Sequence, residues 1–168
     1  MTFEGYLLML NNTTPSAMAF ALKLLGLRNH SQKELERKLL KKGYTVESIY
    51  PALEQLTSQG LLDDRKFSME LIRSRSGRKP SGKMKMRAEL RKRGISETII
   101  GELLKEYESK ELCYRAAEKK IGSLHGTTIT DRKKKLAVFL HNRGFEWQDI
   151  QTVLIHFFQS GLDNEEPC

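Results

Sequence analysis

The sequence contains few prolines and cysteines, and it has no long run of apolar residues. Only four prolines occur in 168 residues, so little interrupts regular helix. The two cysteines, Cys113 and Cys168, lie far apart and offer neither a disulfide framework nor a metal-ligand spacing, which predicts a reducing, cytoplasmic environment. The lack of about 18 consecutive apolar residues excludes a membrane span. The apolar stretch Tyr6–Leu10 is too short for a signal peptide.

Long alternations of β-branched residues are also absent, and what remains is helical periodicity that repeats three times. Gly43, Gly94 and Gly144 are spaced 51 and 50 residues apart. Apolar residues recur at the same offsets from each glycine, at −8, −4, +1, +6, +10 and +13. In the order of the copies they are Leu35, Met86 and Leu136; Leu39, Leu90 and Leu140; Tyr44, Ile95 and Phe145; Ile49, Ile100 and Ile150; Leu53, Leu104 and Leu154; and Leu56, Tyr107 and Phe157. Chance rarely produces six such matches across three copies.

This pattern predicts one helix that ends at each glycine, where φ can be positive, and another that begins just after it. Thr45 and Ser96 suit the N-cap of the following helix, whereas Glu146 is an imperfect third case. A further helix is expected before each pair, at about 16–27, 63–76 and 109–121. The predicted fold is therefore all-α, an elongated, curved tandem array of three three-helix repeats at residues 15–60, 61–109 and 110–160. Residues 1–14 are expected to be an N-terminal leader, and residues 161–168 an acidic tail.

Positive charge is concentrated in residues 63–93, which belong to the second repeat. This stretch holds twelve Lys or Arg and four Asp or Glu, and the difference, 12 − 4 = +8, equals the net charge of the whole protein. Lys83, Arg87 and Arg91 are spaced to share one face of a helix, where like charges are slightly destabilising. A solvated helix face is the ordinary explanation, but the imbalance favours contact with a polyanion or an acidic protein. The residues predicted to make that contact are Arg73, Arg75, Arg78, Lys79, Lys83, Lys85, Arg87, Arg91, Lys92 and Arg93.

The third repeat offers a second candidate contact. A basic run follows Asp131 at the expected start of a helix, where positive charge opposes the helix dipole. With one arginine near the end of the same helix, the candidate residues are Arg132, Lys133, Lys134, Lys135 and Arg143. A solvated face is the alternative for this run. Trp147, Phe157 and Phe158 occur at helical spacing, which favours packing within the array over an exposed anchor for a partner.

Other patterns have structural explanations that are more economical than catalytic ones. Residues 77–83 fit G-x-x-x-x-G-K, but Met84 follows where a phosphate-binding loop needs Ser or Thr, a helix precedes in place of a strand, and Pro80 removes a backbone donor. Asp63 and Asp64 are expected to cap a helix rather than to bind metal or act as paired acids. The four histidines share no ligand spacing. We therefore predict no catalytic residue, no cofactor and no metal.

Five motifs within residues 16–158 resemble those of a known family. They are Ser31-x-x-Glu34-Leu35-x-x-Lys38-Leu39; Gly60-Leu61-Leu62-Asp63-Asp64-x-x-Phe67; Arg73-Ser74-Arg75, followed by Gly82; Leu90-x-x-x-Gly94-Ile95; and Phe139-Leu140-x-x-Arg143-Gly144-Phe145 with Ile150. On these residues the chain resembles the RecX family, the bacterial regulators of the RecA recombinase. The linker 77–82 and the short turn 42–45 depart from the family's pattern.

The resemblance implies a non-enzymatic regulator of RecA, mainly an inhibitor, in DNA repair and recombination. Such a protein lies in the groove of the RecA–DNA filament, bridges protomers and restrains ATP hydrolysis and strand exchange. The resemblance also implies weak, sequence-independent binding to single- and double-stranded DNA, a monomeric state and no association with membranes. The residues alone leave two alternatives open: a stand-alone architectural or transcriptional DNA-binding protein with helix-turn-helix-like modules, and a helical scaffold for an acidic protein.

Overall fold

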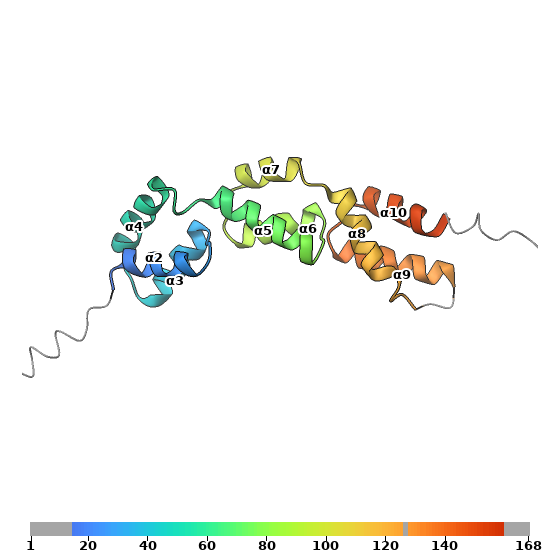
Figure 1. The fold of residues 1–168 in the computed structure, drawn as a ribbon, viewed down its shortest axis with the longest axis horizontal. Helices are drawn as coiled ribbons and strands as arrows, with labels where there is room; N and C mark the ends of the chain where they lie inside the picture. Colours follow the sequence, from blue (N-terminus) through green and yellow to red (C-terminus); the bar gives the residue numbers. More distant parts are fainter. Residues whose placement is uncertain (1–14, 126–127, 160–168) are drawn as a thin grey trace, which may run out of the picture. The chain divides into compact units, whose positions relative to one another are not determined.

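A computed structural model describes residues 15–125 and 128–159, and within them the chain forms nine α-helices and no strand (Figure 1). The first repeat holds α2 (Ala17–Leu27), α3 (Gln32–Lys42) and α4 (Val46–Ser58). The second holds α5 (Asp64–Arg78), α6 (Lys83–Lys92) and α7 (Glu97–Lys105). The third holds α8 (Ser109–Ile121), α9 (Ile129–Asn142) and α10 (Trp147–Gln159).

The predicted all-α class with three helices in each repeat is confirmed, whereas the elongation and curvature of the array stay predictions. The chain divides at Phe67 and Ser68 into two compact units. The expected leader (1–14) and acidic tail (161–168) lie outside the described residues. Among the residues that the structure does describe, no helix has the length and apolar content that crossing a membrane would need.

The three anchor glycines end the second helix of their repeats as the sequence predicts. Their φ angles are +99° at Gly43, +84° at Gly94 and +78° at Gly144. At the first of them, the N–H of Gly43 donates to the carbonyl of Leu40 (3.0 Å), and the N–H of Tyr44 donates to that of Leu39 (3.2 Å). The same paired hydrogen bonds recur at the other two glycines. This is the Schellman arrangement, which satisfies the last helical carbonyls and turns the chain into the next helix.

The apolar residues at −8, −4 and +6 from each glycine form the centre of each repeat. None of these nine side chains is more than 1% exposed. They are Leu35, Leu39 and Ile49 in the first repeat, Met86, Leu90 and Ile100 in the second, and Leu136, Leu140 and Ile150 in the third. Full burial of one such side chain contributes about 1.5–3 kcal/mol. The glycine turn therefore fixes the register in which the second and third helices of each repeat close over a small core.

The two adjacent aspartates at the start of α5 are structural. Asp63 Oδ1 accepts hydrogen bonds from the backbone N–H groups of Arg65 (2.8 Å) and Lys66 (3.0 Å), so the capping interpretation is confirmed there. Asp64 Oδ1 accepts from the backbone N–H of Gln32 at the start of α3 (2.8 Å). Burial raises the pKa of Asp64. Asp64 thus holds the first turn of α5 against the start of α3, within the first compact unit.

The first repeat contains a buried histidine that should make its stability depend on pH. His30 is 2% exposed, and its Nδ1 lies 2.9 Å from the carbonyl oxygen of Arg28. Because a carbonyl can only accept, Nδ1 carries the proton, and a second proton would have to enter at Nε2. That atom is buried without a hydrogen-bond partner among the described residues. Burial, and next the charge of Arg28, lower the pKa of His30.

We expect the first repeat to lose stability as the pH falls below about 6.5, the ordinary histidine pKa. Between that value and the lower folded-state pKa, the unfolded chain binds more protons than the folded chain, so stability falls as the pH falls. Urea unfolding at pH 7.5 and pH 5.5 measures this. The His30→Asn variant should lose this pH dependence, while the exposed His141, changed to Asn, serves as control. An unchanged slope in His30→Asn would contradict the prediction.

Repeats 2 and 3 are joined at the loop between α5 and α6. The N–H of Gly82 donates to the carbonyl of Arg143 (3.0 Å), and Arg143 Nη1 donates to the carbonyl of Pro80 (3.1 Å). The buried Tyr107 hydroxyl donates to the carbonyl of Ser81 (2.6 Å). A Cβ on Gly82 would lie 2.0 Å from the Gly144 carbonyl oxygen. We call this contact the Gly82 joint; it requires glycine because two backbones meet there.

The three aromatic residues of α10 do not share one environment. Phe157 and Phe158 are half-buried, and the Phe157 ring lies 6.3 Å from that of Tyr114. Trp147, by contrast, is 57% exposed. The packing interpretation is therefore wrong for Trp147, because this position, three residues after Gly144, faces away from the repeat's core.

Candidate interaction site

All ten basic residues predicted to make contact lie on one helix–loop–helix segment of repeat 2. Three belong to the second half of α5, one to the loop, and the rest to α6 and its C-cap. The structure separates them into a group that is paired within the protein and a group that is not. The second group defines the candidate site.

Glu89 pairs with two of the ten. Arg75 Nη2 donates to its Oε1 (2.7 Å) and Arg75 Nε donates to its Oε2 (3.2 Å), so the pair is bidentate and links α5 to α6. Arg93 Nη2 lies 3.7 Å from Glu89 Oε1. The hydrogen bond to Glu89, with its charge, raises the pKa of Arg75. These two arginines therefore hold the segment together, and their charges are partly neutralised.

Glu97, at the start of α7, pairs with two more. Its carboxylate accepts from Arg87 Nη1 (3.2 Å) and from Arg91 Nε. The hydrogen bond from Arg91 lowers the pKa of Glu97. From the sequence, Arg87 and Arg91 were predicted to be like charges without a compensating acid. That premise is wrong, because the compensating carboxylate comes from the next helix, four residues beyond the stretch in which charge was counted.

Lys85 also has a partner within the protein, at the Gly82 joint. Its Nζ donates to the carbonyl of Asn142 (3.3 Å). Its Cβ would be 2.6 Å from a Cβ on Gly144, so its backbone packs directly on the end of α9. Lys92 is exposed in the last turn of α6 and is also not free of interactions.

The four remaining cations lie in the second half of α5, in the loop after it and in the first turn of α6. Within residues 15–125 and 128–159, no side-chain hydrogen bond or ion pair engages them, and three of the four are exposed, with the fourth half-buried. They are Arg73, Arg78, Lys79 and Lys83, and we call them the turn cluster. Arg78 and Lys79 lie at the C-terminal end of α5, where positive charge is favoured by the helix dipole.

The loop that carries the turn cluster is not a phosphate-binding loop. Gly77 and Arg78 are still helical, and the N–H of Gly82 is already donated to Arg143. Pro80, Ser81 and Gly82 are buried against repeat 3. The Gly82 joint thus explains the second glycine of the G-x-x-x-x-G-K pattern by close backbone contact. The hydrogen bonds of this joint fix the position of the loop that leads from α5 to α6.

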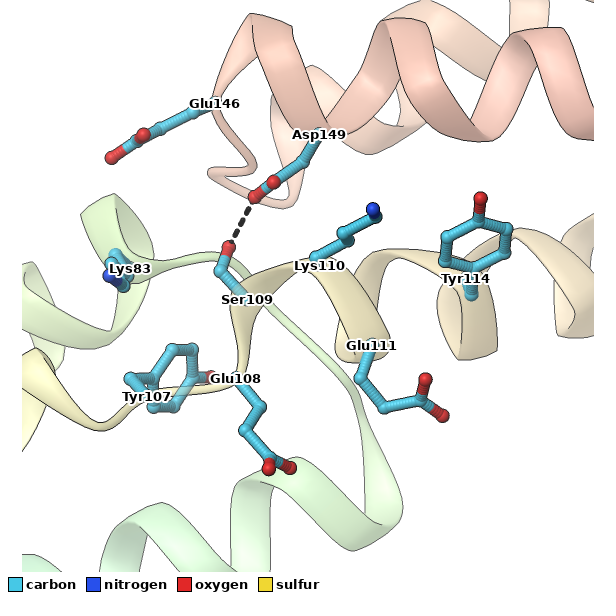
Figure 2. A pocket seen from close by; sticks show the side chains of 9 residues that line it. All are labelled: Lys83, Tyr107, Glu108, Ser109, Lys110, Glu111, Tyr114, Glu146 and Asp149. Carbon is cyan, nitrogen blue, oxygen red and sulfur yellow. Dashed lines mark hydrogen bonds between the residues drawn. The ribbon is translucent and has the colours of Figure 1, made fainter.

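A polar hollow of about 560 Å³ lies beside the turn cluster, between the starts of α6, α8 and α10 (Figure 2). Figure 2 shows Ser109 donating its hydroxyl to Asp149 Oδ2 (2.7 Å) and the Lys83 side chain on the α6 side. The hollow is lined by four carboxylates, Glu108, Glu111, Glu146 and Asp149, against two amines, Lys83 and Lys110. An anion would be repelled from it. Within the described part of the chain, no group of three His, Cys, Asp or Glu side chains is arranged to hold a metal.

Two of the five residues of the second predicted contact, Lys135 and Arg143, are engaged within the protein. α9 begins at Ile129, with Thr128 Oγ1 accepting from the N–H of Asp131 (3.1 Å). The basic run therefore does not open the helix, and Asp131 in the first turn offsets the dipole. Lys135 Nζ donates to the His125 carbonyl (2.6 Å). Arg143 belongs to the Gly82 joint and stacks 4.8 Å from the Phe139 ring, and Arg132 is half-buried. Of this set, Arg132, Lys133 and Lys134 have no side-chain partner within the described residues, and the buried Nε of Arg132 makes no hydrogen bond there.

Comparison with known proteins identifies relatives along most of the chain. Family models of the first, second and third three-helix domains of RecX match residues 17–56, 63–104 and 106–154. The chain is 62% identical over 160 residues to the regulatory protein RecX of Pelodictyon phaeoclathratiforme, covering 95% of this chain and 100% of that one. It is 48% identical over 157 residues to the regulatory protein RecX of Chlorobium limicola, covering 94% and 99%.

Two solved structures share the fold. One is a crystal structure of a regulatory protein RecX, with a TM-score of 0.75 at 23% identity, covering 82% of this chain and 70% of that chain. The other is the crystal structure of RecX from Lactobacillus salivarius, with a TM-score of 0.75 at 22% identity, covering 83% and 93%. At these identities the likeness extends to the fold alone.

Proposed function

The chain belongs to the RecX family of regulatory proteins, and from that premise we propose that it modulates the RecA recombinase, mainly as an inhibitor. In this proposal the protein lies in the groove of the RecA–DNA filament and restrains ATP hydrolysis and strand exchange. RecX is a regulatory family rather than an enzyme family, and we propose that the protein acts by binding, without a reaction of its own.

The observation that carries the proposal is the turn cluster. Four cations without side-chain partners in the described residues lie in the second half of α5, on the loop after it and at the start of α6, next to six others that are engaged within the protein. Such a group attracts the phosphates of DNA or the acidic side chains of a protein. Its binding to DNA does not depend on the base sequence, because the contacts are to charged phosphates and not to base edges. The whole predicted set, including the paired arginines, remains a candidate contact, with the turn cluster as its centre.

The size of the cluster argues that DNA alone is a weak partner. Four phosphate contacts to a single strand give a salt dependence with a log–log slope of about −3. Binding of that kind is lost quickly as salt rises, so at physiological salt the protein needs further contacts to remain bound. We propose that recombinase protomers supply these further contacts and that the charge of the DNA attracts the protein to the filament.

The stand-alone helix-turn-helix alternative has less support. In three-helix DNA-binding domains the third helix enters the major groove. Here that position is occupied by α4, α7 and α10. α4 carries two acids and no Lys or Arg. α7 carries two acids and one lysine, and α10 carries one acid and no Lys or Arg. A net negative helix in each repeat is unsuited to a groove lined by phosphates, whereas the cations gather on the turn between the first and second helices.

An ATPase titration tests the proposal. We expect added protein to lower the ATP turnover of RecA on single-stranded DNA at micromolar concentration. Gel shifts at rising salt, with and without recombinase, provide the control: duplex binding should be weak and salt-sensitive without the filament. Unchanged turnover, together with tight and sequence-dependent duplex binding by the protein alone, would favour the helix-turn-helix alternative and contradict the proposal.

A further inference from the structure

The helices α9 and α10 pack side by side (Figure 1). They border an apolar groove of about 430 Å³. Its floor is made by Ala137 of α9 and by Trp147, Leu154 and Ile155 of α10. Lys133 and Lys134 stand at its rim. Trp147 is 57% exposed and Ile155 is 51% exposed, so among the described residues nothing covers the two largest apolar side chains of the groove.

Comparison of the repeats shows that this groove is an addition peculiar to the third. Counted from the anchor glycines, Ala137 and Trp147 correspond to Arg87 and Glu97 of the second repeat. Those two side chains form an ion pair across α6 and α7 (3.2 Å). At the position of Ile155 the other repeats carry charged residues, Glu54 and Lys105. The shared fold therefore does not require apolar side chains here. The second repeat has an ion pair at two of these positions and the first has Glu36 and Val46, whereas the third repeat presents an open apolar surface.

We propose that this groove is a docking site for an acidic amphipathic helix of a partner protein. The apolar side chains of such a helix would fill the space over Trp147 and Ile155, and its carboxylates would meet Lys133 and Lys134. Trp147 and Ile155 are eight residues apart on α10, which is about 12 Å or two helical turns. That length matches the spacing of anchors at i, i+4 and i+7 by which a helix binds between two others.

The composition of the floor favours a helix over nucleic acid. Proteins that bind single strands offer successive aromatic rings on which bases stack, within a continuous basic groove. Here Trp147 is the single aromatic side chain of the lining, which otherwise holds three aliphatic side chains, the amide of Gln151 and two amines at the rim. Aliphatic side chains pack well on such a floor, while a sugar-phosphate strand would leave it uncovered.

Binding can be measured without any recombinase, so this inference does not depend on the proposed function. The probe is a fluorescein-labelled peptide of about 15 residues, long enough for a stable helix, with leucines along one face and glutamates elsewhere. Its anisotropy should rise on titration with the full chain. Trp147 is the one tryptophan of the sequence, so its emission should shift to the blue as the peptide covers it. A peptide of the same composition with its leucines spread around the helix should not bind.

Two matched variants locate the site. Ile155→Glu places a carboxylate on the groove and should weaken peptide binding by at least about tenfold. It should fold normally, because Glu54 occupies the same position in the first repeat. Val138→Glu makes the same change on α9, where Val138 is 60% exposed and does not line the groove. That control should keep wild-type affinity within about twofold.

Several results would overturn the inference. One is equal weakening by both variants, and another is an oligo-dT strand that displaces the peptide and itself shifts the Trp147 emission. A wild-type dimer that Ile155→Glu converts to monomers would assign the groove to a second copy. A peptide that binds only after residues 160–168 are removed would assign the groove to the chain's own end. By contrast, loss of peptide binding in Ile155→Glu together with normal inhibition of RecA would support the inference and assign the groove to a partner other than RecA.

Discussion

Replacing Gly82 with alanine is expected to uncouple the second repeat from the third. The φ of Gly82 is −76°, which any residue adopts, so the backbone conformation itself is not at issue. The added Cβ would lie 2.0 Å from the carbonyl oxygen and 2.3 Å from the carbonyl carbon of Gly144, and 2.4 Å from the nitrogen of Phe145. All three are backbone atoms that cannot rotate aside, so the joint must open.

Opening the joint removes the hydrogen bonds that converge on the loop, which come from Gly82, Arg143 and Tyr107. Overpacking and lost hydrogen bonds together should cost at least about 2 kcal/mol. Because stability in repeat arrays depends on the interfaces between neighbours, we expect one unfolding transition of repeats 2 and 3 to separate into two. Urea unfolding followed by circular dichroism measures this.

Gly101→Ala is the matched control for this change. Gly101 lies inside α7, and nothing is within 4 Å of the position that its Cβ would take. Alanine in a helix interior is more favourable than glycine by up to about 1 kcal/mol, so this variant should be slightly stabilised. If Gly82→Ala unfolds in one transition at the wild-type urea midpoint, the joint is not a stabilising contact, and its role in fixing the position of the loop is contradicted.

Removing the turn cluster is expected to have the largest effect on binding. In the variant R73Q/R78Q/K79Q/K83Q, four cations that have no partner in the described residues become neutral. The log–log salt slope of single-strand binding should shrink by about 3, nearly to zero. The concentration that half-inhibits RecA should rise by at least about tenfold. Stability should change little, because no ion pair is broken.

The control removes the same charge from elsewhere. In K23Q/K38Q/K41Q/K119Q, four exposed lysines outside the predicted contact are neutralised. Both variants lose the same net positive charge, so long-range electrostatic attraction to the filament falls equally in the two. Any difference in inhibition between them is therefore due to local contacts of the turn cluster. If both variants lose inhibition to the same extent, the protein uses its general positive charge, and the turn cluster has no special role.

The repeat and its core could be predicted from the sequence because they depend on local chemistry. A glycine at a helix end and apolar residues at fixed offsets determine the Schellman turn and the buried face. Leu39, Leu90 and Leu140 are all fully buried at equivalent positions. Asp63 could be assigned as a cap for the same reason, since its partners are the N–H groups two and three residues further along the chain.

The partners of the basic residues could not be predicted, because they depend on contacts between helices. Glu97 neutralises Arg87 and Arg91 from the following helix, and Glu89 reaches Arg75 across the loop. A charge count over a continuous stretch treats these arginines as free. One signal was available in the sequence. Glu97 lies three residues after Gly94, and once Gly94 is known to end α6, this spacing places Glu97 opposite that helix.

The function of Gly82 was also beyond sequence reasoning. Its neighbours Arg143 and Gly144 are far along the chain, and nothing in the pattern 77–83 indicates that two backbones meet there. The exposure of Trp147 was missed for a related reason, because helical spacing alone does not say which side of α10 faces the core.

Acetylation footprinting of lysines, on the protein alone and bound to RecA filaments on single-stranded DNA, tests the central claim most directly. Lys79 and Lys83 should become protected from the reagent when the filament is present, while Lys23 and Lys119 should stay reactive. If Lys79 and Lys83 react equally fast in the bound protein, the turn from α5 to α6 does not contact the filament, and the proposed mode of regulation is wrong.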